Sequence, residues 1–409
     1  MASSSASLST AAPGREHAVD ALRGFALLGI LIVNAGSFAS AYFGMGITDP
    51  AFVRPVDHAT RWLVSLLFES KFYLLFSLLF GYSFALQMDS AGRAGASFVP
   101  RFLRRLLGLA LLGLAHAWLL FVGDILVTYA LLGLVLLALR GLRSSTAVAM
   151  ATSLIACTAL AWGLIAFFVG LLPSDPPTEM LHAQAQAAMQ AYREGVASAI
   201  AQRGHDLTVG GVWFVLAFVQ APCALAMFLL GLVAQRSGCL MAAARQPARL
   251  LRWLACCFPV GIAGALFYAS VQVRAEALPE HVGLAALAVD LATAPFLTFS
   301  YLAGLLWLLQ KGRAGRALGA VLEPAGRMAL SNYLLQSFMG AMVFTAYGFA
   351  LIGRVPPLAV LLGALGLYAA QLVFSRHWLR THAYGPAEWL LRALTHWRWP
   401  AWRRAPAQA

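Results

Sequence analysis

The sequence predicts an all-α, polytopic integral membrane protein with about ten transmembrane helices. Hydrophobic residues make up 61% of its 409 residues and charged residues only 11%, and the mean hydropathy is +0.75; a soluble domain of this length is far less apolar. The apolar residues also gather into runs long enough to cross a bilayer, about 20 residues each. These runs are expected to be helical, because a backbone exposed to lipid must satisfy its own hydrogen bonds.

Ten such runs follow one another along the chain. We place the spans at residues 19–43, 59–88, 101–122, 124–140, 145–171, 208–235, 249–273, 283–310, 324–350 and 356–378. Residues 1–18 are expected to form a disordered cytoplasmic tail, residues 19–378 the transmembrane domain, and residues 379–409 a cytoplasmic C-terminal segment. Because residues 1–18 lack an apolar core followed by a cleavage site, we expect the first span itself to direct insertion.

The placement of the charges supports this topology. With the N-terminus in the cytoplasm, most of the 29 Lys and Arg residues fall in inner loops and tails, whereas most acidic residues fall on the outer side. The positive-inside rule therefore favours ten spans with both termini in the cytoplasm. Since the net charge of +13 follows the loops, we expect membrane lipids and no nucleic acid as partners. The five cysteines show no metal-ligand spacing and predict neither a disulfide nor a metal site.

Two segments outside the spans are also expected to be helical. The longest polar connection, residues 173–207, has an Ala/Gln-rich middle that predicts a helix at the outer face. The tail "GPAEWLLRALTHWRWPAW", from Gly385 to Trp402, begins with a turn and a proline and then mixes Trp and Leu with Arg and His. This pattern predicts an interfacial helix on the inner leaflet.

Polar residues in the first span indicate a functional site, because isolated charges near the bilayer centre are costly. The span opens with "VDALRGF", in which Asp20 and Arg23 share one helical face at the cytoplasmic end. Asn34 lies deeper in the same run. A capping acid and a snorkelling arginine would also explain Asp20 and Arg23.

The ninth span, "EPAGRMALSNYLLQSFMG", adds a second polar group. Its Arg327 stands at the same membrane level as Arg23, and two arginines there could bind phosphate from the cytoplasm through bidentate hydrogen bonds. Asn332 and Gln336 are four residues apart and share a helical face. Hydrogen bonding between helices is the alternative role for these two amides.

The second span contains two charges, Glu69 and Lys71, in "LLFESKFYLLF". Both need partners inside a membrane. At a spacing of two they point to different sides of a regular helix, so a direct pair would require the helix to break near Ser70. An ion pair with another helix is the alternative.

The third and fourth spans meet in "GLAHAWLLFVGDILVTYALLG", which contains His116 and Asp124. Asp124 fits the N-cap of the fourth span. His116 is either a satisfied packing residue or a group that accepts and returns a proton near neutral pH. By depth, both belong to an outer polar layer that also includes Asn34, Glu69, Lys71 and Asp290, whereas Asp20, Arg23, Arg327 and Asn332 form an inner layer.

Five ordered blocks carry a family resemblance: "DALRGFALLGILIVN", "KFYLLFSLLFGYSFALQ", "HAWLLFVGDILVTYALLG", "GRMALSNYLLQS" and "GPAEWLLRALT". On these motifs the chain resembles, over nearly its whole length, the YeiB-like family of bacterial inner-membrane proteins, whose C-terminal portion is a domain of unknown function. The resemblance implies a multi-pass protein of the bacterial inner membrane. It implies no settled activity.

A more distant likeness suggests a chemistry. The D-x-x-R-G motif at Asp20, followed by Asn34, is similar to the first span of transmembrane acyltransferases such as heparan-α-glucosaminide N-acetyltransferase. Those enzymes use cytoplasmic acetyl-CoA to acylate a sugar across the membrane, through an asparagine and a histidine. This similarity places Asn34 at the asparagine, His58 roughly at the histidine and Glu69 at a later acid. We rank His116 above His58, because His116 lies within a main motif of the YeiB-like pattern.

The leading prediction is a transmembrane acyltransferase. An acyl donor such as acyl-CoA would bind near Arg23 and Arg327 from the cytoplasm. His116 would activate an acceptor hydroxyl or amine of a sugar, lipid or other small molecule from the outer side, and Asn34 would stabilise the developing oxyanion. Either Asp124 or Glu69 would orient His116 and stabilise its imidazolium. The predicted catalytic residues are His116, Asp124, Asn34, Glu69 and Lys71, and the predicted donor-binding residues are Asp20, Arg23, Arg327, Asn332 and Gln336. No metal and no tightly bound cofactor is expected.

The rival prediction is a small-solute transporter or exporter in which Glu69, Lys71 and His116 handle substrate or protons at mid-membrane depth. A membrane scaffold for partner proteins is a third alternative, but it would leave the buried charges without a task. The sequence is compatible with a homo-oligomer and does not specify one.

Overall fold

The computed structural model describes residues 13–172 and 178–404, and within these ranges the chain is helical with no β-strand. The α-helices are α1 (Pro13–Ala39), α2 (Pro55–Leu67), α3 (Lys71–Arg93), α4 (Phe98–Leu119), α5 (Leu126–Ala138), α6 (Ser144–Gly170), α7 (Thr178–Glu194), α8 (Val196–Thr208), α9 (Val212–Val215), α10 (Ala221–Arg236), α11 (Cys239–Ala244), α12 (Pro247–Gln272), α13 (Glu280–Leu309), α14 (Gly312–Arg327), α15 (Ala329–Phe344), α16 (Pro357–Thr381) and α17 (Pro386–His396). The all-α prediction is confirmed.

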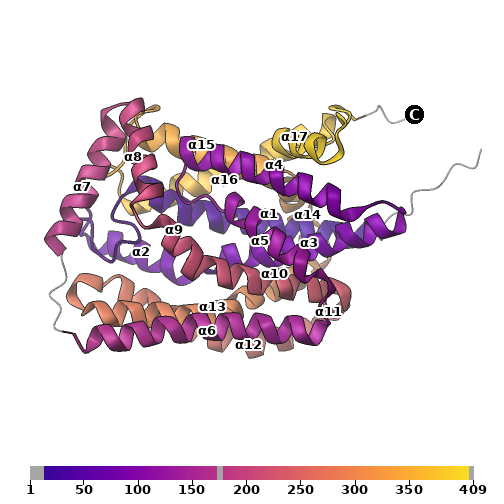
Figure 1. The fold of residues 1–409 in the computed structure, drawn as a ribbon, viewed down its shortest axis with the longest axis horizontal. Coiled ribbons are helices and arrows are strands. Elements are labelled where there is room, and N and C mark those ends of the chain that lie inside the picture. The colour runs from indigo at the N-terminus through magenta and orange to yellow at the C-terminus, as the bar shows by residue number, and fades with distance from the viewer. Residues whose placement is uncertain (1–12, 173–177, 405–409) are drawn as a thin grey trace, which may run out of the picture.

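The long helices lie side by side along one direction and form a bundle (Figure 1). The helices α7 and α8 lie together at one end of the bundle, at the left of Figure 1. The helices α11 and α17 lie at the opposite end, to the right. The segment 173–207, predicted to carry one outer helix, therefore holds two helices over its described part, which meet at Gly195. Residues 173–177 of that segment and residues 1–12 of the predicted tail lie outside the described ranges.

Eight helical segments are long and apolar enough to cross a membrane. They are His17–Ala39, Pro55–Arg93, Phe98–Leu119, Ser144–Gly170, Val212–Arg236, Pro247–Gln272, Glu280–Leu309 and Pro357–Thr381. They confirm a polytopic membrane protein and account for eight of the ten predicted spans.

The predicted fourth and ninth spans are shorter helices. Helix α5 has 13 residues and passes into a single 3-10 turn at its end. The ninth span is broken at Met328, whose backbone leaves the helical region with φ −109° and ψ 31°, so that α14 and α15 are separate. Hydropathy alone did not reveal this break, because Met328 is an apolar residue with ordinary helix propensity.

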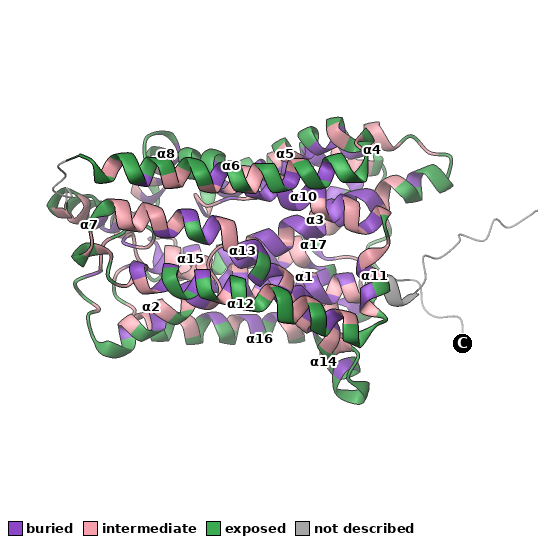
Figure 2. Cartoon of the chain, turned by 90° about the horizontal axis from the view of Figure 1, so that it is seen from below, coloured by how far each residue is buried: buried purple, intermediate pink, exposed green. Residues whose placement is uncertain are grey.

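The centre of the bundle and its lipid-facing rim differ in burial. Residues of α3 and α10 are largely buried, whereas α6 and α12 present many exposed residues (Figure 2). The exposed positions of α6 are apolar, including Leu160, Phe167 and Phe168. A large apolar face that no other helix covers is expected for a helix that lies against lipid.

Close packing of α1 against α14 depends on two glycines. A Cβ added to Gly326 of α14 would overlap the backbone oxygen of Asp20 on α1, and one added to Gly24 would overlap the backbone oxygen of Leu322. Small residues let helix backbones approach in this way inside membranes. The contact fixes α1 and α14 together beside Arg23 and Arg327.

Candidate functional site

The best-defined polar pair is formed by His116, near the end of α4, and Asp124, in the turn before α5. The His116 Nδ1 atom lies 2.8 Å from Asp124 Oδ1, and the two side chains are only 1% and 2% exposed. The second oxygen, Oδ2, accepts a hydrogen bond from the backbone N–H of Val127 at 2.8 Å. Asp124 thus satisfies an N–H of the first turn of α5 from one residue before the N-cap, which is Ile125 and not Asp124 as predicted, and it binds the imidazole as well.

The other ring nitrogen of this histidine is free. His116 Nε2 is buried and has no hydrogen-bond partner among the described residues. An ionised carboxylate can only accept hydrogen bonds, so in the neutral imidazole the Nδ1 atom facing it carries the proton and Nε2 presents a lone pair. The site therefore contains a buried base whose reactive atom is unoccupied.

Aromatic rings surround the imidazole. The Tyr333 ring of α15 lies 5.0 Å from the His116 ring, and Phe121 lies 6.4 Å from it, measured between centroids. Phe121 in turn stacks on Phe38 of α1 at 4.5 Å. Asn34 lies one helical turn before Phe38 on the same helix and is half-buried.

A second buried pair joins Lys71 to Asp290 of α13. The Lys71 ammonium lies 3.2 Å from Asp290 Oδ1, and both side chains are fully buried. The ammonium also donates to the backbone oxygen of Ser65 at 3.2 Å. The alternative of an ion pair with another helix is therefore correct for Lys71.

The helix of the predicted second span breaks near Ser70, which is the break that a direct Glu69–Lys71 pair would require. Helix α2 ends at Leu67, Ser70 has a left-handed backbone with φ 64°, and α3 begins at Lys71. Despite the break, Lys71 turns to Asp290, and Glu69 is half-buried and forms no ion pair within the described ranges. The two charges consequently belong to one cluster without being partners.

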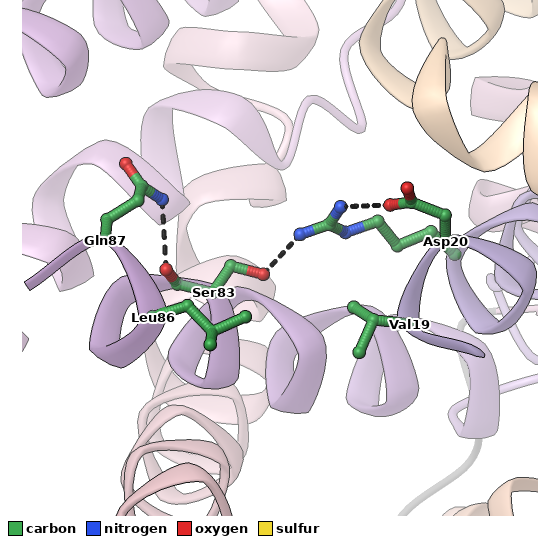
Figure 3. Close-up of a pocket in the computed structure, with 6 residues that line it drawn as sticks. Val19, Asp20, Ser83, Leu86 and Gln87 are labelled. Carbon is green, nitrogen blue, oxygen red and sulfur yellow. Dashed lines mark hydrogen bonds and ion pairs between the residues drawn. The ribbon is translucent and has the colours of Figure 1, made fainter. Parts of the chain in front are cut away.

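At the opposite end of the bundle, Arg23 bridges α1 and α3. Its guanidinium donates to Asp20 Oδ1 at 2.6 Å and to the Ser83 hydroxyl. These residues line a cavity of about 190 Å³ together with Val19, Leu86 and Gln87. Figure 3 shows the guanidinium held between Asp20 and Ser83, with Gln87 on the far side of Ser83, where its amide donates to the Ser83 backbone oxygen at 3.1 Å.

Further positive charge surrounds this cavity. Arg327 is exposed at the end of α14 and lies close enough to Asp20 to interact with its charge. Arg105 of α4 interacts with the charges of Arg23 and Arg392, and its Nε atom is buried without a hydrogen-bond partner in the described part of the chain. The predicted inner pair of arginines is therefore part of a larger basic group that includes Arg105 and Arg392.

Asn332 and Gln336 connect helices. The Asn332 amide donates to the Ser375 hydroxyl at 2.9 Å, and the Gln336 amide donates to Gln371 Oε1 at 2.8 Å. Gln371 returns a hydrogen bond to the Asn332 backbone oxygen at 3.0 Å. The alternative of hydrogen bonding between helices thus describes both amides, which tie α15 to α16.

The remaining candidates lie apart from these groups. His58 sits in the first turn of α2, where Nδ1 lies 3.3 Å from Arg61. Sequence reasoning missed Ser83, Arg105 and Glu388 as members of the inner group. Ser83 and Glu388 had a signal, namely their places in the quoted blocks "KFYLLFSLLFGYSFALQ" and "GPAEWLLRALT", whereas Arg105 lies outside the five blocks.

The comparisons with known proteins identify the family of this chain. A family model described as a protein of unknown function, DUF418, matches residues 234–398. The uncharacterized protein YxaH of Bacillus subtilis is 34% identical over 398 residues, which cover 93% of this chain and 94% of YxaH. The chain belongs to the YeiB-like (DUF418) family.

Two other relatives match the chain over a similar length. The uncharacterized protein YeiB of Escherichia coli is 28% identical and covers 93% of this chain and 96% of its own. An uncharacterized 39.9 kDa protein of Bacillus acidopullulyticus, encoded in an amylase 3′ region, is 27% identical, with 92% and 93% covered. No solved structure matches the chain. For this YeiB-like protein, function must therefore be argued from the site itself.

Proposed function

We propose that this protein is a membrane acyltransferase that moves an acyl group from a cytoplasmic donor to a hydroxyl or amine acceptor on the outer side of the inner membrane or within it. One observation supports this function above all others. His116 is held by Asp124 at 2.8 Å and keeps its buried Nε2 atom without a partner. A histidine oriented by a carboxylate, with its second nitrogen free, has the geometry of a general base.

The proposed reaction uses that nitrogen twice. Nε2 takes the proton from the acceptor O–H or N–H while the acceptor atom attacks the thioester carbonyl of the donor. When the thiolate leaves, the imidazolium returns the proton to it, and Asp124 stabilises the imidazolium in between. We assign this supporting role to Asp124 in place of Glu69, because Asp124 is the carboxylate bonded to Nδ1.

Asn34 is the candidate for the oxyanion. Asn34 lies one helical turn before Phe38, which stacks on Phe121, and the Phe121 ring lies 6.4 Å from that of His116. This chain of ring contacts supports the assignment. A side-chain amide that hydrogen-bonds the tetrahedral oxyanion lowers the barrier by several kcal/mol.

The donor would enter at the basic group around Arg23. Guanidinium groups bind phosphate in a bidentate manner, and Arg23, Arg105 and Arg327 gather at that end of the bundle. From Asp20 to Asn34 the rise along α1 is about 21 Å at 1.5 Å per residue. A donor that spans this depth needs a long narrow arm between its phosphates and its reactive carbonyl, and acyl-CoA has one.

The test uses the purified chain in lipid nanodiscs with acetyl-CoA and longer acyl-CoAs. Release of free CoA is measured with amino sugars, glycerol and phosphatidylethanolamine as acceptors, for the wild type, His116→Gln and the control His58→Gln. We expect release to fall by about 10²–10⁴-fold in His116→Gln and to stay unchanged in His58→Gln. Full activity in a folded His116→Gln protein would disprove the assignment.

Donor binding is measured separately by native mass spectrometry. Saturable binding of acyl-CoA to the wild type and its loss in an Arg23→Ala, Arg327→Ala double variant would support the proposed entrance. No binding of any acyl-CoA to the wild type would exclude a CoA-dependent enzyme.

A second candidate function, transport of a small solute, is favoured by the break between α2 and α3. Unwound backbone beside buried charges at membrane depth is typical of transporter binding sites, and Ser70 stands next to the Lys71–Asp290 pair. In sealed vesicles a transporter would accumulate an unmodified solute with dependence on an ion gradient. An acyltransferase would produce a modified acceptor without one.

A further inference from the structure

The cluster at the α2–α3 break contains more acidic groups than basic groups. Two carboxylates, Glu69 and Asp290, share one ammonium, Lys71. If all three groups were ionised, the cluster would hold one net negative charge inside the membrane-spanning bundle. An uncompensated charge at that depth costs several kcal/mol, so a second positive charge is required.

No side chain in the described ranges supplies that charge. The other titratable groups that face the cluster are Tyr268 of α12, Tyr73 of α3 and Cys223 of α10, all of which are neutral or negative. Lys71 is already committed to Asp290 Oδ1 and to the backbone oxygen of Ser65. The missing positive charge must therefore come from outside the protein.

The two acids offer places for it. Asp290 is fully buried, and its Oδ2 atom has no hydrogen-bond partner among the described residues. Glu69 lies in the turn between the two helices and is half-buried, whereas Asp290 is fully buried. The side chains of Ser65 and Tyr268 lie within hydrogen-bonding reach of the Glu69 carboxyl. The Thr298 hydroxyl of α13 bonds to the Lys71 backbone oxygen at 3.0 Å and holds the break against that helix.

We propose that Glu69 and Asp290 hold one exchangeable proton beside Lys71, which makes the α2–α3 break a proton-binding site. Uptake of the proton from solvent brings the cluster from one net negative charge to zero, and its release restores the charge. The role does not depend on acyl transfer, because neither carboxylate is bonded to His116.

The experiment is a pH titration of the protein in nanodiscs of zwitterionic lipid, followed by infrared difference spectroscopy of the protonated carboxyl stretch. Wild type is compared with Glu69→Gln, Asp290→Asn, Lys71→Met and the control Glu280→Gln, which alters an exposed glutamate on the same helix as Asp290. Size-exclusion chromatography and circular dichroism establish that each variant is folded. All titrations are repeated with sodium in place of potassium.

The expected pattern follows from the charge count. One protonated carboxyl signal should disappear in both Glu69→Gln and Asp290→Asn, because each leaves one acid for one ammonium. It should persist in Lys71→Met with a midpoint raised by about 1–3 pH units, since a nearby cation no longer favours the ionised form. Glu280→Gln should match the wild type.

Two results would overturn this assignment. One is the survival, in Glu69→Gln, of every titrating carboxyl signal seen in the wild type. If Asp290→Asn fails to fold, the Glu69→Gln spectrum is sufficient to decide the assignment. The other is a midpoint that falls as the sodium concentration rises, which would make sodium the missing cation in place of a proton.

Discussion

Glu388 of α17 caps the first turn of α15 through Ser331. Its Oε1 atom accepts the backbone N–H of Leu330 at 2.6 Å and that of Ser331 at 3.1 Å, and Oε2 accepts the Ser331 hydroxyl at 2.5 Å. The first N–H groups of a helix have no partner within the helix itself. The break at Met328 would leave those of α15 unsatisfied, and a residue from the C-terminal segment satisfies them.

Replacing this acid should loosen α15. We expect Glu388→Ala to lower the free energy of unfolding by about 1–3 kcal/mol, because buried donors lose their acceptor. The measurement is thermal unfolding in mild detergent, with Glu280→Ala as the matched control, since Glu280 lies in the first turn of α13 and is exposed. An unchanged midpoint in Glu388→Ala would contradict the capping role.

The same carboxyl should make stability depend on pH. Burial raises the pKa of Glu388 above its ordinary value of 4.5, against the opposing effect of its hydrogen bonds with Ser331 and Leu330. Between the ordinary and the raised pKa, the folded protein binds more protons at this site than the unfolded chain does. Its contribution to stability is therefore present below the ordinary pKa and is lost as the pH rises through the raised pKa.

Unfolding midpoints recorded across this interval should fall less steeply with rising pH in Glu388→Gln than in the wild type. Identical slopes in both proteins would show that Glu388 titrates alike in the folded and unfolded chain.

The contact between α1 and α14 should be intolerant of a methyl group. An added Cβ on Gly326 would overlap the Asp20 backbone oxygen, so we expect Gly326→Ala to force the helices apart, to destabilise the fold by about 1–3 kcal/mol and to weaken acyl-CoA binding near Arg23. Gly319→Ala on the same helix is the control, because its Cβ would meet only a Leu309 side-chain carbon at 3.5 Å. Equal unfolding midpoints for the two variants would refute this prediction.

Hydropathy and charge were sufficient to predict the membrane spans but not their irregularities. A long apolar run can be recognised as a span from its own residues alone. Its length matches the bilayer, and as a helix it satisfies its own backbone hydrogen bonds in lipid. The separation of α14 from α15 depends instead on Glu388, which lies 57 residues beyond Ser331. A single sequence contains no signal for a hydrogen bond that is made across the fold.

The polar pairs of the candidate site likewise differ in whether the sequence alone could predict them. His116 and Asp124 are eight residues apart in two consecutive spans joined by a tight turn, so their meeting follows from local geometry. The Lys71–Asp290 pair joins residues 219 apart, and only the packing of α3 against α13 brings them together. For this reason the sequence predicts that Lys71 needs a partner and that Asp290 lies in the same polar layer. It does not predict that the two residues form a pair.

The last prediction concerns the orientation of His116. Asp124→Asn keeps the shape of the side chain, and the amide oxygen can still accept the Val127 N–H that Asp124 accepts now. The amide can also donate to Nδ1, which would leave the proton on Nε2 and remove the base. We expect acyl transfer to fall by about 10⁴-fold, as for a carboxylate that fixes a catalytic histidine, while the unfolding midpoint changes little. Asp206→Asn, which alters a carboxylate at the α7–α8 end of the bundle that accepts a hydrogen bond from Tyr192, should leave transfer intact. Normal CoA release by folded Asp124→Asn protein would show that the buried pair serves packing alone.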